Sequence, residues 1–278
     1  MAEITAELVK KLRDATNVSM MDCKRALAEA GGDMAAATRL LRERGMAVAA
    51  KKASRAANQG LIAAAKADQG RTAALVEVNC ETDFVARNAG FAAFVAQVAA
   101  AACTTDGNLA ERLREQTVAK IAELGENIVI RRHVRYTLSG PGGLATYIHL
   151  GGKVGVMVEL GCERPATAEQ EAFQALIKDL TLQIAAANPR HRCAEDVPAE
   201  EIAAERAIYA KQAEGKPPAV VAKMVEGKLK KYFQEVCLIE QPYVREPKQT
   251  VGGLLAAKAK ELGDTLTVRR FARYQLGE

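Results

Sequence analysis

The first part of the chain carries apolar residues at helical spacing. In residues 5–44, Leu, Val and Met recur three and four positions apart in three runs, which "TNVS" and "GGD" separate. Ser19 and Asp33 stand just before the second and third runs, where a side-chain oxygen can accept hydrogen bonds from the free amides of a helix start. The pattern predicts a unit of three short helices.

The next segment, residues 46–59, changes character. "MAVAAKKASRAANQ" is rich in Ala and basic residues and lacks apolar periodicity, and Gly60 follows it. This composition predicts a linker or an exposed helix between the three-helix unit and the rest of the chain.

The remainder of the sequence repeats itself. "ALVEVNCETD" (74–83) matches "VMVELGCERP" (156–165) at a shift of 82, and "VIRRHVRYTL" (129–138) matches "TVRRFARYQL" (267–276) at a shift of 138. The shift of 82 also superimposes one apolar helical face on another: Phe91, Phe94, Val95 and Val98 on Phe173, Leu176, Ile177 and Leu180. Each copy is predicted to contain two strands, a helix and a closing strand.

The two shifts differ by 56 residues, so the second copy carries an insertion of about that length. Its sequence predicts two antiparallel helices around the turn "GKPP" at residues 215–218. Apolar side chains recur at spacings of three and four on the second arm: Val221, Met224, Val225, Leu229, Tyr232, Phe233 and Val236. This pattern indicates a projecting helical hairpin.

Together these patterns predict an α+β fold. We expect a three-helix domain at 1–45, a linker at 46–59, a first α+β subdomain at 60–139 and a second at 140–278. The hairpin insertion is expected within the second, at about 188–240.

Composition and charge narrow the functional class. The six cysteines lie far apart in sequence, which fits buried, reduced thiols better than a zinc site or a disulfide framework. The N-terminus is amphipathic and contains acidic residues, and no apolar run approaches the roughly 18 residues of a membrane span, so we expect a cytoplasmic protein. The net charge of +5 comes from interleaved charges and favours nucleic acid only weakly.

The sequence offers little support for an enzyme. The nearest approach to a phosphate-binding loop, at Gly152 and Lys153, has Tyr147 in place of the first Gly and Val154 in place of the hydroxyl residue. The three histidines are too far apart in sequence to indicate a metal site or a triad. We expect no catalytic residue, no metal site and no cofactor.

An RNA- or ribosome-associated basic protein is the alternative. "IRRHVRY" and "VRRFARY" interleave Arg with aromatic residues, which could hold a phosphate backbone and stack bases. In a half-buried strand, however, one residue of each Arg pair must face inward or lie at an edge. A structural salt bridge explains the duplicated pair equally well.

The tetrapeptide Thr82, Asp83, Phe84 and Val85 stands at a predicted strand-to-helix junction. The repeat places Arg164, Pro165, Ala166 and Thr167 at the same positions of the second copy, which therefore lacks the aromatic residue. One hypothesis is that Thr82 or Asp83 caps the helix and that Phe84 is presented outward at its tip for a partner. The other is that Asp83 caps the helix and Phe84 packs under the loop.

Several of these segments resemble the bacterial translation elongation factor Ts family. The resemblance rests on "MMDCKRALAEAGGD" (20–33) and "EVNCETDFVARNAGF" (77–91), supported by "LGENI" (124–128), the hairpin segment "GKPPAVVAKMVEGKLKK" and "VGGLL" (251–255). It covers nearly the whole chain. It implies a ubiquitin-associated-like N-terminal domain, two related subdomains with antiparallel sheets, and an inserted antiparallel coiled-coil hairpin.

The resemblance also implies a function without covalent chemistry. Members of the family promote GDP release from elongation factor Tu, and residues matching Thr82, Asp83, Phe84 and Val85 disturb its magnesium ion. The aromatic residue matching Phe84 enters an apolar crevice of that GTPase.

The same resemblance suggests further partner contacts near Met20, Met21, Asp22 and His149. For the two methionines, the other possibility is a place in the core of the three-helix unit. No direct nucleic-acid or membrane partner is implied, and the hairpin offers a possible surface for self-association.

Overall fold

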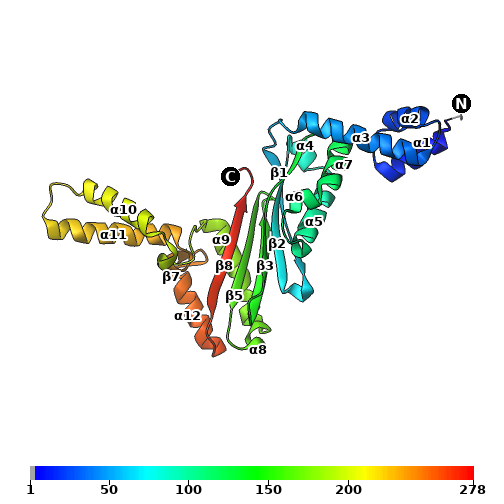
Figure 1. The fold of residues 1–278 in the computed structure, drawn as a ribbon. Helices are drawn as coiled ribbons and strands as arrows, with labels where there is room; N and C mark the ends of the chain where they lie inside the picture. Colours follow the sequence, from blue (N-terminus) through cyan, green and yellow to red (C-terminus); the bar gives the residue numbers. More distant parts are fainter. Residues whose placement is uncertain (1–3) are drawn as a thin grey trace.

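The computed structural model describes residues 4–278 and is a mixture of helices and antiparallel sheets, as expected for an α+β fold. The molecule is elongated (Figure 1). The N-terminal helices lie at one end, a pair of helices extends from the other, and two sheets lie between them.

The N-terminal unit consists of the three predicted helices, α1 (Ala6–Thr16), α2 (Met20–Glu29) and α3 (Met34–Lys52). Both predicted N-caps are confirmed. Ser19 accepts a hydrogen bond from the amide of Asp22, and Asp33 accepts from the amides that begin α3. The unit has its own core, formed by Val9, Leu12, Cys23, Ala26, Leu27, Ala37 and Leu41.

The third helix continues through residues 46–52, so the exposed-helix alternative holds for this part of the expected linker. Two causes extend it. Its Ala-rich sequence favours a helix, and α3 packs against α7 (Arg114–Leu124). Gly45 is buried at this contact, and a Cβ atom there would stand 3.5 Å from Cβ of Ala122, an ordinary van der Waals distance.

The first sheet has three antiparallel strands in the order β1-β2-β3. Their bounds are β1 (Gln59–Ala67), β2 (Thr72–Cys80) and β3 (Ile128–Thr137). Between β2 and β3 the chain forms α4 (Asp83–Ala86), α5 (Ala89–Thr104), α6 (Leu109–Arg112) and α7.

The second sheet has the equivalent antiparallel order β4-β5-β8. Its strands are β4 (Gly142–His149), β5 (Val154–Gly161) and β8 (Thr267–Gln275). The helices between β5 and β8 include α8 (Pro165–Ala168), α9 (Glu171–Ala187) and α12 (Val251–Leu262). The prediction of one helix per copy is therefore incomplete, because α7 and α12 each precede a closing strand.

The predicted apolar helical face is confirmed in both copies. Phe91 of α5 and Phe173 of α9 are fully buried against their own sheets, as are the neighbouring residues of each face. A further apolar cluster with Leu75, Leu144 and Met157 lies between the two sheets. Strand β2 is thus covered on both faces, which explains why every one of its residues is buried.

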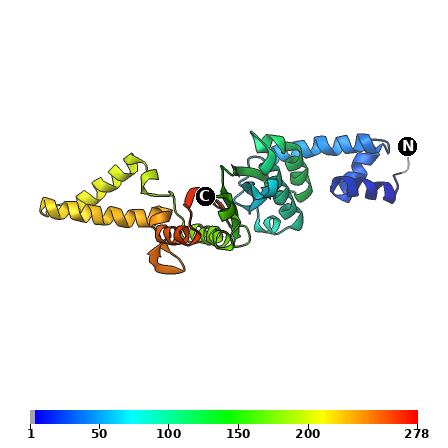
Figure 2. The ribbon, with the colours of Figure 1, turned by 90° about the horizontal axis from the view of Figure 1, so that it is seen from below.

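The inserted segment forms the two predicted helices, α10 (Ala199–Gln212) and α11 (Pro218–Val236). They extend away from the sheets, as Figure 2 shows from below. Only part of the predicted apolar stripe is buried: Val225, Leu229, Tyr232 and Val236. The chain then returns through a small hairpin, β6 (Pro242–Tyr243) and β7 (Glu246–Thr250), which the sequence did not predict.

A β-bulge in β3 determines where the side chains of Arg131 and Arg132 point. In the register of β2 and β3, Glu77 lies opposite Arg132 and Val78 lies opposite Ile130, so Arg131 is the extra residue. The bulge interrupts the alternation of side chains, which lets Arg131 and Arg132 reach the same carboxylate. Their contacts with the buried Glu77 measure 3.2 and 2.7 Å.

The second copy repeats this arrangement. A bulge at Glu159 makes Arg269 the extra residue, and Arg269 and Arg270 bind the buried carboxylate at 3.1 and 2.7 Å. Burial acts to raise the pKa of Glu159, but hydrogen bonds from Ser139 and the two arginines outweigh it and hold that pKa below its ordinary value. The duplicated Arg pairs are therefore structural salt bridges, as one of the two interpretations of the sequence held, and each pair lies on an edge strand of its sheet.

Candidate protein-binding site

The junction after β2 is a short, capped turn of helix. Thr82 has an extended backbone and caps α4, and its hydroxyl oxygen accepts from the amide of Val85 at 3.3 Å. The sequence left Thr82 and Asp83 open as the cap, and the structure has Thr82, because Asp83 already lies in the helix. Its carboxylate pairs instead with Arg87 at 3.0 Å, one turn further on.

Phe84 is the most exposed large apolar residue of those that the structure describes, with 82% of its surface accessible. Its neighbours anchor the helix: Ala86 is buried and Val85 packs against the core of the first sheet. The hypothesis that Phe84 packs under the loop is therefore wrong. Burying a Phe side chain stabilises a folded protein by about 1.5–3 kcal/mol. Phe84 does not contribute this stabilisation, because its side chain stays exposed.

A carboxylate from another turn braces this junction. Glu126, just before β3, accepts hydrogen bonds from the amides of Glu81 and Thr82, both at 3.0 Å. Its other oxygen accepts from the Thr82 hydroxyl at 2.6 Å. In return, the carboxylate of Glu81 accepts from the amide of Asn127 at 2.7 Å. The turn that presents Phe84 is thus tied to the sheet from both sides.

The buried thiol of Cys80 adds a further contact. It donates a hydrogen bond to the carbonyl of Thr82 at 3.2 Å. Burial, with a smaller contribution from the nearby carboxylate of Glu126, raises the pKa of Cys80 to about 11. The thiol therefore stays protonated and acts as a donor, not as a nucleophile.

The other predicted contact residues in the N-terminal unit lie at the start of α2. Met20 and Met21 are 42% and 64% exposed, so the alternative that they belong to the core does not hold. Asp22 binds the hydroxyl of Ser19 at 2.6 Å and pairs with Arg25. Hydrogen bonds from these two residues lower the pKa of Asp22.

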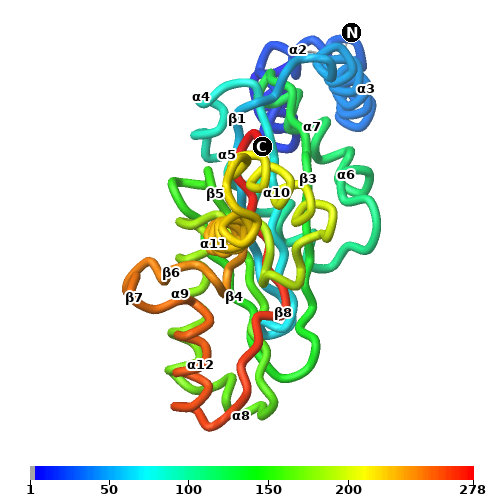
Figure 3. Tube along the Cα trace, turned by 90° about the vertical axis from the view of Figure 1, so that its left-hand side faces the viewer, coloured from blue at the N-terminus to red at the C-terminus, as the bar shows by residue number. Residues whose placement is uncertain are grey.

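His149 lies at the exposed end of β4. Its Nδ1 atom is 2.9 Å from the hydroxyl of Tyr147, and the two rings stack. The turn that follows lies beside the start of β1, because the amide of Ile62 donates to the carbonyl of Gly152 at 2.8 Å. Since the start of β1 pairs with the end of β2, His149 lies at the same end of the sheets as α4. Figure 3 shows α4 at this end, toward the N-terminal helices.

The sequence did not predict two residues of this end. Leu150 is 67% exposed and has a left-handed backbone (φ 49°), a conformation that brings Cβ close to the following carbonyl oxygen and is uncommon for residues other than Gly, Asn and Asp. Glu126 was not singled out either. A signal existed for Glu126, because the shift of 138 that aligns the closing strands also aligns Glu126 with Asp264.

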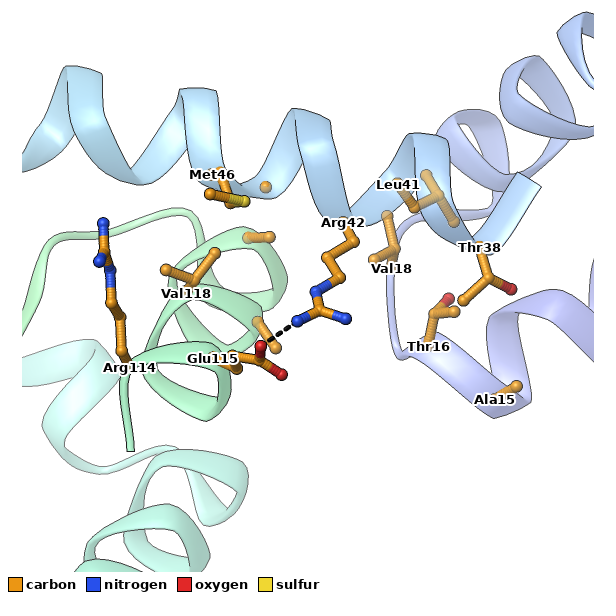
Figure 4. A pocket seen from close by; sticks show the side chains of 13 residues that line it. Ala15, Thr16, Val18, Thr38, Leu41, Arg42, Met46, Arg114, Glu115 and Val118 are labelled. Atoms are coloured by element: carbon orange, nitrogen blue, oxygen red, sulfur yellow. Dashed lines mark hydrogen bonds and ion pairs between the residues drawn. The ribbon is translucent and has the colours of Figure 1, made fainter. Parts of the chain in front are cut away.

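A cavity of about 380 Å³ lies where the three-helix unit meets α7 (Figure 4). Leu41, Met46 and Val118 contribute apolar walls, and an ion pair between Arg42 and Glu115 crosses it. The cavity therefore lies at a contact between α3 and α7 and does not include the predicted site residues.

Metal-binding clusters and membrane-spanning helices are both absent from residues 4–278. In this part of the chain, no cluster of three or more His, Cys, Asp or Glu side chains could hold a metal ion. Nor does any helix there have the length and apolar character to cross a membrane. All six cysteines are buried free thiols, which confirms that prediction.

Comparison with known proteins identifies the chain. Residues 81–278 match the family model described as Elongation factor TS. The elongation factor Ts of Nitratidesulfovibrio vulgaris strain DP4 is 45% identical over 277 residues, which cover 99% of this chain and 96% of that protein. That of Symbiobacterium thermophilum is 46% identical over 284 residues, covering 100% and 93%. That of Clostridium novyi is 43% identical over 290 residues, covering 99% and 93%.

These matches first place the chain among the elongation factors of protein biosynthesis. Within that class, it belongs to the elongation factor Ts family.

Proposed function

We propose that the protein is a guanine-nucleotide exchange factor for the translational GTPase elongation factor Tu. The observation that carries this proposal is Phe84, a large aromatic side chain held 82% exposed on a braced turn of a family member. A few aromatic residues that become desolvated on binding supply most of the energy of many protein interfaces. Phe84 would enter an apolar crevice of the GTPase, and Asp83 beside it would contact the same surface.

The proposed mechanism is a free-energy coupling between two ligands of the GTPase. If binding of this chain lowers the affinity of the GTPase for GDP, then binding of GDP lowers the affinity of the GTPase for this chain by the same factor. The magnesium ion is the natural target, because it screens the nucleotide phosphates and is held by few protein ligands. Displacing it speeds GDP release without covalent chemistry, so this chain itself needs no cofactor.

Further contacts belong to the same proposal. Met20, Met21 and Asp22 would dock the three-helix unit on the GTPase, and His149 would touch it from the second sheet. The support is the exposure of Met20, Met21 and His149, the partial exposure of Asp22, and the place of these residues at the ends of α2 and β4. We also propose the family architecture, in which the N-terminal unit is ubiquitin-associated-like, the two sheets form related subdomains and the hairpin packs as a coiled coil. The hairpin is the proposed surface for self-association, and the cytoplasm, where translation occurs, is the proposed location.

The alternative of an RNA-binding protein loses its motivating observation. The Arg pairs that suggested RNA contacts bind the buried carboxylates of Glu77 and Glu159. Two of them, Arg132 and Arg270, also stack on Tyr274 and Tyr136 of the opposite sheet, at 4.3 and 4.1 Å from the ring centres. These side chains are already engaged within the protein.

A release assay tests the proposal. Elongation factor Tu loaded with a fluorescent GDP analogue is mixed with excess unlabelled GDP, with and without this chain, and release is followed by stopped flow. We expect release to accelerate with the concentration of the chain. No acceleration, together with RNA binding that falls steeply with salt, would favour the RNA-binding alternative.

A further inference from the structure

We infer that Glu126 is the positioning residue for Phe84, an inference that rests on the proposed role of Phe84 as the partner anchor. The two residues are far apart in sequence, and Glu126 acts through Thr82. It needs no contact with the partner.

The helix that carries Phe84 depends on its cap. A helix as short as α4, Asp83–Ala86, has too few internal hydrogen bonds to be stable alone. Its direction is therefore set by the residues that hold its first turn. Thr82 holds that turn through its hydroxyl, which accepts from the amide of Val85 at 3.3 Å.

Glu126 fixes the orientation of this hydroxyl. The Thr82 hydroxyl proton points to one carboxylate oxygen of Glu126 at 2.6 Å, which leaves the oxygen's lone pair for Val85. The other carboxylate oxygen holds the amides of Glu81 and Thr82. Hydrogen bonds to a charged group are about twice as strong as neutral ones, so this single side chain restrains both the backbone and the side chain of the cap.

The second copy contains a simpler version of the same device. Asp264 accepts from the amides of Glu163 and Arg164 at 3.2 and 3.1 Å. At its cap, Arg164 offers no hydroxyl, and no side-chain cap is formed for α8. The amide contacts are thus common to both copies, but the cap differs: Glu126 binds the hydroxyl of the cap residue Thr82, whereas Asp264 pairs with the guanidinium of the cap residue Arg164 at 3.6 Å.

A double-mutant cycle between Glu126→Ala and Phe84→Ala tests the inference, with GDP release from elongation factor Tu as the readout. We expect Glu126→Ala alone to lower exchange about fivefold, since it removes charge-assisted hydrogen bonds from the turn. In the Phe84→Ala background it should lower exchange less than twofold, because there is no ring left to misplace. Glu126→Asp, which can still reach the two amides as Asp264 does, should retain more exchange than Glu126→Ala.

Asp264→Ala is the matched control. It should lower the unfolding temperature by an amount similar to Glu126→Ala and leave exchange unchanged. Full additivity of Glu126→Ala and Phe84→Ala, or no effect of Glu126→Ala on exchange, would overturn the inference while leaving the role of Phe84 intact. If Phe84→Ala alone leaves exchange unchanged, the proposed role of Phe84 fails first and the inference fails with it. Should Glu126→Ala not fold, Glu126→Gln takes its place in the cycle, with an expected loss of about twofold.

Discussion

The two strand-to-helix junctions share their backbone supports but differ in the helix cap and in one exposed ring. In both copies a buried Cys donates to a backbone carbonyl two residues later at 3.2 Å, and a carboxylate from the turn before the closing strand binds two backbone amides. In both, a four-residue helix follows. Only the first copy places an aromatic residue, Phe84, where the second has Ala166, and that ring is exposed.

This difference shows which residues of the junction the local fold requires and which it does not. The second copy folds the same junction with Ala at that position, so the aromatic ring is not required for the local structure. A large aromatic side chain that the local fold does not require and that stays 82% exposed is consistent with the proposed partner anchor.

The largest expected effect is on the free energy of unfolding, and it tests whether the two buried carboxylates stabilise their own copies equally. Glu77→Gln and Glu159→Gln each remove the charge that holds an Arg pair, and we expect each to lower the free energy of unfolding by about 2 kcal/mol. The cost stays below that of a fully buried pair because the four arginines keep 25–42% of their side-chain surface exposed. Denaturant titration measures both variants. A cost confined to one copy would break the proposed equivalence.

A smaller effect, on GDP release, is expected at the turn between the first two strands of the second copy. Leu150 and Asp68 occupy equivalent positions with the same left-handed backbone (φ 49° and 51°), but here the second copy carries the exposed apolar residue. We expect Leu150→Ala to lower exchange about threefold, as for a contact at the margin of an interface, because its turn lies at the same end of the sheets as α4.

Asp68→Ala in the first copy is the control for this variant and should leave GDP release unchanged. Equal losses in the two variants would show that the effect is not specific to the end that carries Phe84.

Much of the fold could be predicted from periodicity and repetition. The caps at Ser19 and Asp33, the apolar faces of α5 and α9 and the two arms of the hairpin all follow from local spacing. Such features depend on residues that are close in sequence, where propensity and pattern are informative.

The parts that could not be predicted depend on contacts between distant segments. The bulges at Glu77 and Glu159 arise from strand pairing, and they bring both arginines of each pair to one carboxylate, which strict alternation does not predict. The hydrogen bonds between Glu126 and Thr82 join residues 44 positions apart. At the site itself, the sequence indicated that Phe84 differs between the copies, but it did not decide between Thr82 and Asp83 as the helix cap.

The central claim is that one exposed ring drives exchange, and Phe84→Ala tests it most directly. The measurement is stopped-flow release of a fluorescent GDP analogue from elongation factor Tu, with Ala166→Phe as the matched variant at the equivalent position of the second copy. We expect Phe84→Ala to keep the wild-type unfolding temperature and to lose on the order of 2 kcal/mol of coupling, more than tenfold in release rate. Ala166→Phe should change neither quantity. An unchanged release rate for correctly folded Phe84→Ala would contradict the account.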